Sequence, residues 1–202
     1  MRRIQVLAVV VLTVACAPSV ALEQASTTTT TVEDTTTTTS SAATAALSAT
    51  ADPGPFELGS IAFTEMGAIP VEHTCDGPDV SPPLRVSGLP DTTESVVVVA
   101  EDPDTPMGTW THWVLFDVPV EPTDMRLPEG KAGGGLSALN SWNVTGYKGP
   151  CPPDGEEHRY VFTVYALSGT LGLPEGVEAS AVYEAMQDLV ISSTQLTGIY
   201  GR

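Results

Sequence analysis

The sequence predicts a mainly β domain in which two antiparallel sheets pack together and one helix follows late in the chain. Three stretches carry this prediction because they are rich in β-branched and aromatic residues: ESVVVVAE at 94–101, THWVLFDV at 111–118 and RYVFTVYAL at 159–167. Turn-forming runs such as DGPD, GLPD and DVPVEP separate the strands. Strands and helices do not alternate regularly along the chain, so the sequence does not predict a parallel sheet.

The predicted strands differ in how their apolar residues are arranged. The stretch 94–101 is a continuous β-branched run, which is typical of a strand buried on both faces. In 111–118 two sets of residues alternate, as the two faces of a strand do. The sets are His112, Val114, Phe116 and Val118 against Trp113, Leu115 and Asp117. Shorter strands are expected at 57–62, near 84–86 and at 191–200.

One helix is predicted at residues 181–190, where the apolar residues follow helical spacing and Ser180 is available as the N-cap. A second helix near 132–139 is disfavoured by its glycines. The segment 121–157 is long, rich in glycine and proline, and contains Trp142 and Tyr147. Loops of that length inside a domain are usually functional or disordered, and the aromatic residues favour a function.

Composition divides the chain into three segments. Residues 1–21 hold two arginines and then an apolar stretch too short to span a bilayer, which is the layout of a secretory signal. The run LTVAC resembles a bacterial lipoprotein cleavage box and predicts Cys16 as the lipidated residue; the alternative is ordinary secretion with cleavage at 17–21. Residues 22–55 are rich in threonine and predict a disordered linker. Residues 56–202 have the length of one folded domain.

Charge excludes several classes of partner. Residues 56–202 contain six Lys or Arg and 21 Asp or Glu, so their formal charge is near −15, within a total of −17 for the chain. Nucleic-acid binding needs clustered basic residues, and so does broad attraction to anionic lipid. We therefore expect no nucleic-acid partner. Any bound anion must be held by local donors against the overall field.

The use of cysteine fits an exported protein. Once Cys16 is assigned to the signal, Cys75 and Cys151 remain as an even pair, which an oxidising compartment would join in a disulfide. Such a bond would close a loop of about 75 residues and stabilise the fold by about 4 kcal/mol in the chain-entropy estimate. The alternative is a pair of buried free thiols.

Two of the three histidines stand at the start of predicted strands, His112 in THW and His158 in HRY, and Asp102 ends the strand before the first. If these strands are antiparallel neighbours, the three side chains meet at one rim of the sheet. An imidazole can donate to an anion while a carboxylate fixes its other nitrogen. We expect Asp102 to orient His112, and His158 and Tyr160 to donate to a ligand. Pro150, Pro152 and Pro153 would stiffen one wall.

Three other interpretations apply to these residues. Two histidines and a carboxylate could form a facial-triad metal site, but no H-x-D or H-x-x-x-H spacing is present, so no metal is expected. A serine hydrolase would need a G-x-S-x-G elbow, which is absent, and Ser81 precedes a proline in a turn-like context. The remaining alternative is that His112 and His158 merely cap strands with satisfied hydrogen bonds.

Three longer motifs resemble the phosphatidylethanolamine-binding protein (PEBP) family: HTCDGPDVSPPL at 73–84, VVVAEDPDTPMGTWTHWV at 97–114 and GYKGPCPPDGEEHRYVFTVYAL at 146–167. They are similar in particular to its bacterial and archaeal branch, the Raf kinase inhibitor-like proteins, and the likeness covers 56–202. It implies an antiparallel β-sandwich with a few small peripheral helices and an anion pocket at the surface.

The resemblance also implies the residues of that pocket. The ligand-binding residues would be Asp102, His112, Pro150, Cys151, Pro152, His158 and Tyr160, with Pro103, Asp104 and Trp113 at the rim. Members of the family bind phosphate-bearing head groups, and some inhibit kinases or serine proteases. Where relatives often read N-D-F-G, this chain has NSWN at 140–143, so the outer edge of the pocket is expected to differ.

Together these observations predict an exported protein, lipid-anchored on the extracytoplasmic face of the cell membrane. Its domain would bind phosphate or a phosphoethanolamine-like group, without turnover and without a cofactor. The alternative is a protein-interaction module that inhibits an envelope protease or kinase through the loop 121–157.

Overall fold

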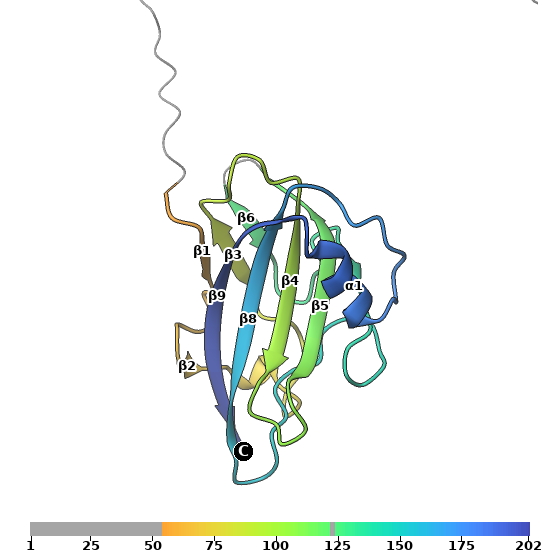
Figure 1. The fold of residues 1–202 in the computed structure, drawn as a ribbon. Helices are drawn as coiled ribbons and strands as arrows, with labels where there is room; N and C mark the ends of the chain where they lie inside the picture. Colours follow the sequence, from red (N-terminus) through yellow and green to blue (C-terminus); the bar gives the residue numbers. More distant parts are fainter. Residues whose placement is uncertain (1–53, 122–123) are drawn as a thin grey trace, which may run out of the picture. The chain divides into compact units, whose positions relative to one another are not determined.

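The computed structural model describes residues 54–121 and 124–202 (Figure 1). The predicted signal segment, the lipidation site at Cys16 and residues 22–53 of the predicted linker lie outside the described residues. The statements below concern the described part of the chain alone.

The described residues form two β-sheets. The smaller sheet has the order β1-β3-β6, with β1 at Glu57–Gly59, β3 at Leu84–Ser87 and β6 at Met125–Leu127. The larger sheet has the order β2-β9-β8-β4-β5-β7. Its strands are β2 at Gly67–Ala68, β4 at Ser95–Asp102, β5 at Trp110–Pro119, β7 at Leu136–Ser137, β8 at Glu157–Leu167 and β9 at Val190–Gly201. Two short helices accompany them, the 3-10 helix η1 at Val71–His73 and α1 at Ala179–Met186.

Two apolar clusters lie on opposite faces of the larger sheet. The first joins the two sheets, because it contains Leu58 and Val86 from the smaller sheet together with Val98 and Phe162 from the larger one. The second lies beneath α1, which packs on the other face next to β5 (Figure 1). The four central valines of β4 are buried because alternate residues enter opposite clusters. The prediction of a mainly β fold with two packed sheets is confirmed.

Element boundaries depart from the sequence pattern at the strand expected over 57–62, which ends at Gly59, and at the predicted helix. The helix begins at Ala179 with Glu178 at the N-cap position, so the prediction that Ser180 caps it is wrong. It ends at Met186 because Val190, expected to be helical, already pairs with Leu167 as the first residue of β9. The segment 132–139 forms no helix. Instead it contributes the short strand β7, preceded by glycines with positive φ.

Strand β5 contains two irregularities that the alternating pattern did not predict. Opposite β4, Ala100 pairs with Trp113 and Glu101 pairs with Thr111, which leaves His112 as an extra residue in a β-bulge. Further along, Asp117 has a φ of 50° and a second register shift follows. Val118 therefore joins Trp113 and Leu115 in the cluster between the sheets, so the predicted division of 111–118 into two faces is wrong at Val118.

Candidate functional site

Antiparallel pairing brings three predicted residues to one end of the larger sheet. Asp102 is the last residue of β4, whereas His112 and His158 lie near the starts of β5 and β8. Because β4 pairs antiparallel with both neighbours, its end meets their beginnings, as the lower end of the sheet in Figure 1 shows. All three side chains are buried.

A cavity of about 220 Å³ opens at this end of the sheet. Three polar groups, Asp102, His112 and His158, lie on its lining, and most of the remaining lining is apolar. The other lining residues are Thr105, Pro106, Met107, Trp110, Trp142, Cys151, Pro152 and Pro153. The cavity is thus a small hollow with mostly apolar walls and a few convergent polar groups, the usual composition of a ligand site.

The tautomer of His112 follows from its hydrogen bond. Its Nδ1 lies 2.7 Å from the carbonyl oxygen of Lys148, and because a carbonyl only accepts, Nδ1 carries the hydrogen. In the neutral ring Nε2 is therefore a bare acceptor. Burial lowers the pKa of His112 below its ordinary value of 6.5, against the opposing effects of the Lys148 carbonyl and the Asp102 charge. The prediction that Asp102 orients His112 is wrong, because Lys148 does so.

His158 is the ring that Asp102 orients. Its Nδ1 lies 2.7 Å from Oδ2 of Asp102, and its Nε2 lies 3.2 Å from Oε2 of Glu156. Burial alone would lower the pKa of His158, but the hydrogen bonds and charges of the two carboxylates outweigh burial and raise it. Because ionised carboxylates only accept hydrogen bonds, this arrangement favours the imidazolium form of His158, in which both nitrogens donate. The surroundings of the two histidines thus favour opposite charge states.

Tyr160 packs against His112 but is not among the residues that line the cavity. It is 2% exposed, and its ring meets the imidazole of His112 edge to face with centroids 5.2 Å apart. Its buried hydroxyl makes no hydrogen bond of good geometry within the described residues, although Asp102 and the Cys151 backbone lie close enough to affect its pKa. Burial, followed by the negative charge of Asp102, raises the pKa of the Tyr160 phenol, so the group remains a donor. An unpartnered buried hydroxyl is costly and rare in folded proteins.

The turn after β4 is clamped to the start of β8. The backbone amide of Asp104 donates to Oδ1 of Asp102 over 2.9 Å, and the Asp104 carboxylate accepts two side-chain hydrogen bonds from Arg159, at 2.6 and 3.0 Å. Hydrogen bonds from the Arg159 side chain and backbone lower the pKa of Asp104 to about 2. Asp104 therefore holds the turn in place, and neither Asp104 nor Pro103 contributes to the lining.

Trp113 does not shape the rim, contrary to the prediction. It is 3% exposed and packs in the cluster between the sheets, with its ring edge to face against Tyr147 at 5.8 Å. The aromatic wall of the cavity is built by Trp110 and Trp142. The Trp142 ring lies 4.9 Å from His112 and 5.4 Å from Trp110, in edge-to-face geometry.

The loop that carries Trp142 is fixed next to His112. Ser141 exchanges two hydrogen bonds with Thr111, one from each backbone amide, both at 2.9 Å. The Asn140 side chain accepts from the amide of Trp142 at 3.0 Å and donates to Gly146 at 3.1 Å. The segment 140–143, in which this chain departs from the family pattern, thus supplies part of the outer wall.

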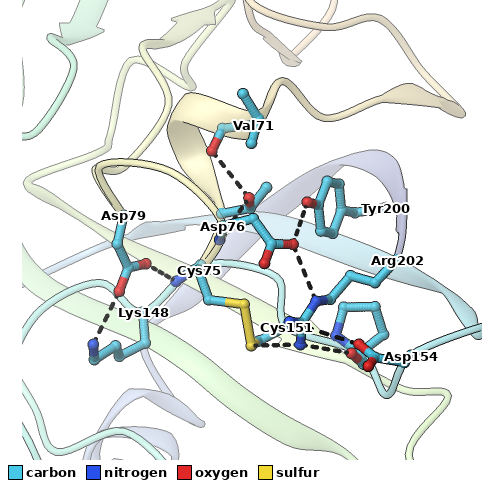
Figure 2. The surroundings of a disulfide bond; sticks show 12 residues. Val71, Cys75, Asp76, Asp79, Lys148, Cys151, Asp154, Tyr200 and Arg202 are labelled. Carbon is cyan, nitrogen blue, oxygen red and sulfur yellow. Dashed lines mark hydrogen bonds and ion pairs between the residues drawn. A yellow bond between two sulfur atoms is a disulfide. The ribbon is translucent and has the colours of Figure 1, made fainter.

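A disulfide fixes the opposite wall. Cys75 is bonded to Cys151, and both cysteines are exposed (Figure 2). Beside the bond, the Cys75 amide donates to the Pro150 carbonyl at 3.1 Å, so Pro150 is occupied in this contact and does not line the cavity. Asp79 holds the preceding residues, accepting from the Lys148 ammonium at 2.9 Å and the Gly149 amide at 2.6 Å. The carbonyl that orients His112 belongs to this braced segment.

Comparisons with known proteins agree with this architecture. The family profile described as phosphatidylethanolamine-binding protein matches residues 59–201. The chain belongs to the phosphatidylethanolamine-binding protein family.

Relatives of this PEBP domain occur in archaea and bacteria. A UPF0098 protein of Methanothermobacter thermautotrophicus is 41% identical over 149 residues, which span 70% of this chain and 95% of the relative. The UPF0098 protein PH1269 of Pyrococcus horikoshii is 41% identical over 152 residues, spanning 71% of this chain and 75% of the relative.

Two solved structures share the PEBP fold. CT736 of Chlamydia trachomatis, described as a PEBP homologue, is 36% identical with a TM-score of 0.68, covering 73% of this chain and 97% of that chain. YbcL of E. coli, described as a member of the mammalian PEBP family, is 27% identical with a TM-score of 0.67, covering 73% and 98%.

Several lining residues of this PEBP domain were not predicted. Trp110 and Met107 stand in the DPDTPMGTW run, of which only Asp102, Pro103 and Asp104 were predicted to belong to the site. Glu156, which contacts His158 without lining the cavity, was not predicted either. It lies two residues before His158, a spacing that places two side chains on one face of a strand, so the signal was present.

Metal ligation has no support in the geometry. Within 54–121 and 124–202, no group of three His, Cys, Asp or Glu side chains is placed to hold a metal ion.

In the same part of the chain, no helix has the length and hydropathy needed to cross a membrane.

Proposed function

We propose that this PEBP domain binds a small oxyanion, either phosphate or a phosphate monoester such as a phosphoethanolamine-like head group, in the cavity beside His112 and His158. The observation that carries the proposal is the convergence of Asp102, His112 and His158 on the lining of one mostly apolar cavity. The buried Tyr160 hydroxyl, next to His112, adds a donor that has no hydrogen-bond partner of good geometry among the described residues. A ligand oxygen would satisfy it. Burying a polar group without a hydrogen bond costs about 1–3 kcal/mol, which a stably folded protein keeps where the group has a use.

The protonation states of the site favour an oxyanion that retains one hydroxyl. Tyr160 and the imidazolium of His158 are donors, whereas the neutral His112 offers an acceptor at Nε2. A phosphoryl group with one proton can accept from the first two and donate to the third. The second pKa of a phosphate monoester lies near 6, so the species with one proton is about half of the population at pH 6 and about a tenth at pH 7.

The walls of the cavity limit what surrounds the anionic group. Trp110, Trp142 and Met107 give the mouth an apolar surface, and the volume of about 220 Å³ admits a head group of a few heavy atoms. Because no Lys or Arg occurs among the described lining residues, affinity depends on hydrogen bonding and a single cationic ring. We therefore expect moderate affinity that falls as salt increases.

Binding without turnover is the simpler chemistry for these residues. Thr105 is the one hydroxyl residue among the described lining residues, and it donates to the Gly108 carbonyl with no base beside it. The Cys151 sulfur is held in the disulfide. A nucleophile needs an adjacent base or a depressed pKa, and neither residue has one.

A second function is supported by the surface around the mouth. Met107 and Trp142, which line the cavity, are 85% and 40% exposed, and Val144, two residues after Trp142 in the chain, is 43% exposed. Exposed apolar residues in one region are typical of protein contacts. An inhibitor of an envelope protease or kinase would use this surface. Replacing His112 and His158 separates the two functions, because loss of anion binding with intact inhibition would assign the inhibition to the loop.

The proposed export and lipid anchoring rest on the sequence at Cys16 and on the exposed disulfide, which persists in an oxidising compartment.

The binding proposal is tested by calorimetry with inorganic phosphate and phosphoethanolamine on Tyr160→Phe. Loss of a hydrogen bond to a charged group, worth about 1.5–3 kcal/mol, should weaken binding roughly tenfold or more. Tyr183→Phe is the matched control, since its hydroxyl donates to Glu101 near α1, on the other face of the sheet. Equal affinities for Tyr160→Phe and the unaltered protein would contradict the role given to this hydroxyl.

A further inference from the structure

Glu156 reaches the site from solvent. Its side chain is 56% exposed, yet Oε2 lies 3.2 Å from Nε2 of His158, whose own side chain is 6% exposed. The backbone of Glu156 is held on both sides, because its amide donates to Pro153 at 3.0 Å and its carbonyl accepts from Arg202 at 3.2 Å. The main chain is thus fixed, while the long side chain remains able to change rotamer.

The donor that Glu156 occupies, Nε2 of His158, belongs to the one cationic side chain among the described lining residues. Among the described lining residues no Lys or Arg occurs, so the imidazolium of His158 is the cationic donor of the cavity. Its Nδ1 is committed to the buried Asp102. Nε2 is the remaining charged donor, and in this structure a carboxylate of the chain itself accepts from it.

We propose that Glu156 is an internal competitor for the ligand: its carboxylate accepts from His158 Nε2 when the site is empty, and an incoming oxyanion displaces it. This inference rests on the proposed function. Asp102 is buried and accepts a hydrogen bond from the Asp104 amide, so its side chain stays in place. The Glu156 side chain, in contrast, can rotate away from His158 toward solvent. The exchange replaces one carboxylate on the imidazolium by another oxyanion, and it conserves the number of charge-assisted hydrogen bonds.

The competition has an electrostatic cost for the ligand. With Asp102 and Glu156 both beside a single imidazolium, the local formal charge is −1 before any anion arrives. Removing the Glu156 charge brings it to zero. Because Glu156 is more than half exposed, solvent screens it strongly, and the effect on affinity should be that of a surface ion pair, about two- to fivefold.

The test compares Glu156→Gln with Glu157→Gln by calorimetry, using inorganic phosphate as the probe. Glu157 is the matched control because it is exposed, adjacent in sequence and of equal charge, and its side chain makes no hydrogen bond or ion pair within the described residues. Glu156→Gln should bind phosphate about two- to fivefold more tightly than the unaltered protein, with a smaller gain at high salt. Glu157→Gln should change affinity much less.

The alternative outcomes are distinct. An equal gain in phosphate affinity in both variants would assign the effect to the overall negative charge of the domain. Weaker phosphate binding by Glu156→Gln would mean that Glu156 itself contributes to binding. Either outcome overturns the inference while the proposed function stands. Absence of phosphate binding by every protein overturns both. As a second readout, NMR titration of His158 should show a lower pKa in Glu156→Gln than in Glu157→Gln, and equal values would overturn the contact.

Discussion

His158 donates a hydrogen bond of 2.7 Å from Nδ1 to Oδ2 of Asp102, although 56 positions of sequence separate the two residues. The bond joins the end of β4 to the start of β8 and is buried on both sides. It favours a positive charge in the site, because the Asp102 carboxylate beside the ring raises the pKa of His158. The chemistry proposed for the cavity depends on this pair.

Replacing Asp102 should therefore damage both the fold and the site. In Asp102→Asn the carboxamide still fits, but the imidazolium loses its buried counter-charge, so we expect the free energy of unfolding to fall by about 1–3 kcal/mol. Urea denaturation measures this. Asp91→Asn, at an exposed position with the same charge change, should leave stability within about 0.5 kcal/mol. Equal stability of the two variants would mean that the Asp102–His158 bond contributes nothing.

The two imidazoles should titrate on opposite sides of pH 6.5. Two carboxylates raise the pKa of His158, and burial lowers the pKa of His112. NMR titration of the imidazole signals measures both values separately. Titration of both rings at the same pH, or in the reversed order, would contradict the assigned charges.

These pKa shifts have opposite effects on stability. The raised pKa of His158 contributes stability that is fully present below pH 6.5 and is lost as the pH rises through the folded pKa. The lowered pKa of His112 favours the fold at neutral pH, and this contribution is lost as the pH falls from 6.5 through its folded pKa. His158→Gln should therefore flatten the alkaline limb of the stability profile and leave the acid limb.

Removing the disulfide should destabilise the domain and loosen one wall of the cavity. In the variant with Cys75→Ser and Cys151→Ser, release of a bond across 76 positions should lower the free energy of unfolding by about 2–5 kcal/mol. Guanidinium denaturation of the oxidised protein and the variant measures the difference. Phosphate affinity should fall as well, because the segment that orients His112 is no longer braced. Unchanged affinity would show that Asp79 alone holds that segment.

Lipid anchoring at Cys16 is tested by fractionation. The full chain should partition with membranes when expressed in a bacterium that processes lipoproteins, and Cys16→Ser should move it to the soluble fraction. Release of the unaltered chain into the soluble fraction would favour ordinary secretion.

The sequence predicted that the site residues converge because three long strands have clear sequence patterns. Antiparallel pairing of these strands then places the end of one beside the starts of the other two. The prediction failed where a single extra residue changes the direction of side chains. The β-bulge at His112 leaves no periodic signal, so the residue that orients His112 was misassigned. Pairing of β9 with β8 likewise ended α1 earlier than its helical spacing indicated. Glu156 was not predicted although it stands two residues before His158, because that spacing does not distinguish it from the many other acids of this acidic chain.

The most direct measurement is an NMR titration of the three histidine side chains with inorganic phosphate. His73 is an internal control, since it is buried and its Nδ1 contacts the Val80 carbonyl, outside the lining of the cavity. We predict saturable shifts at His112 and His158 at millimolar phosphate or below, and none at His73. Unmoved signals at His112 and His158, or equal shifts at all three rings, would contradict binding in this cavity.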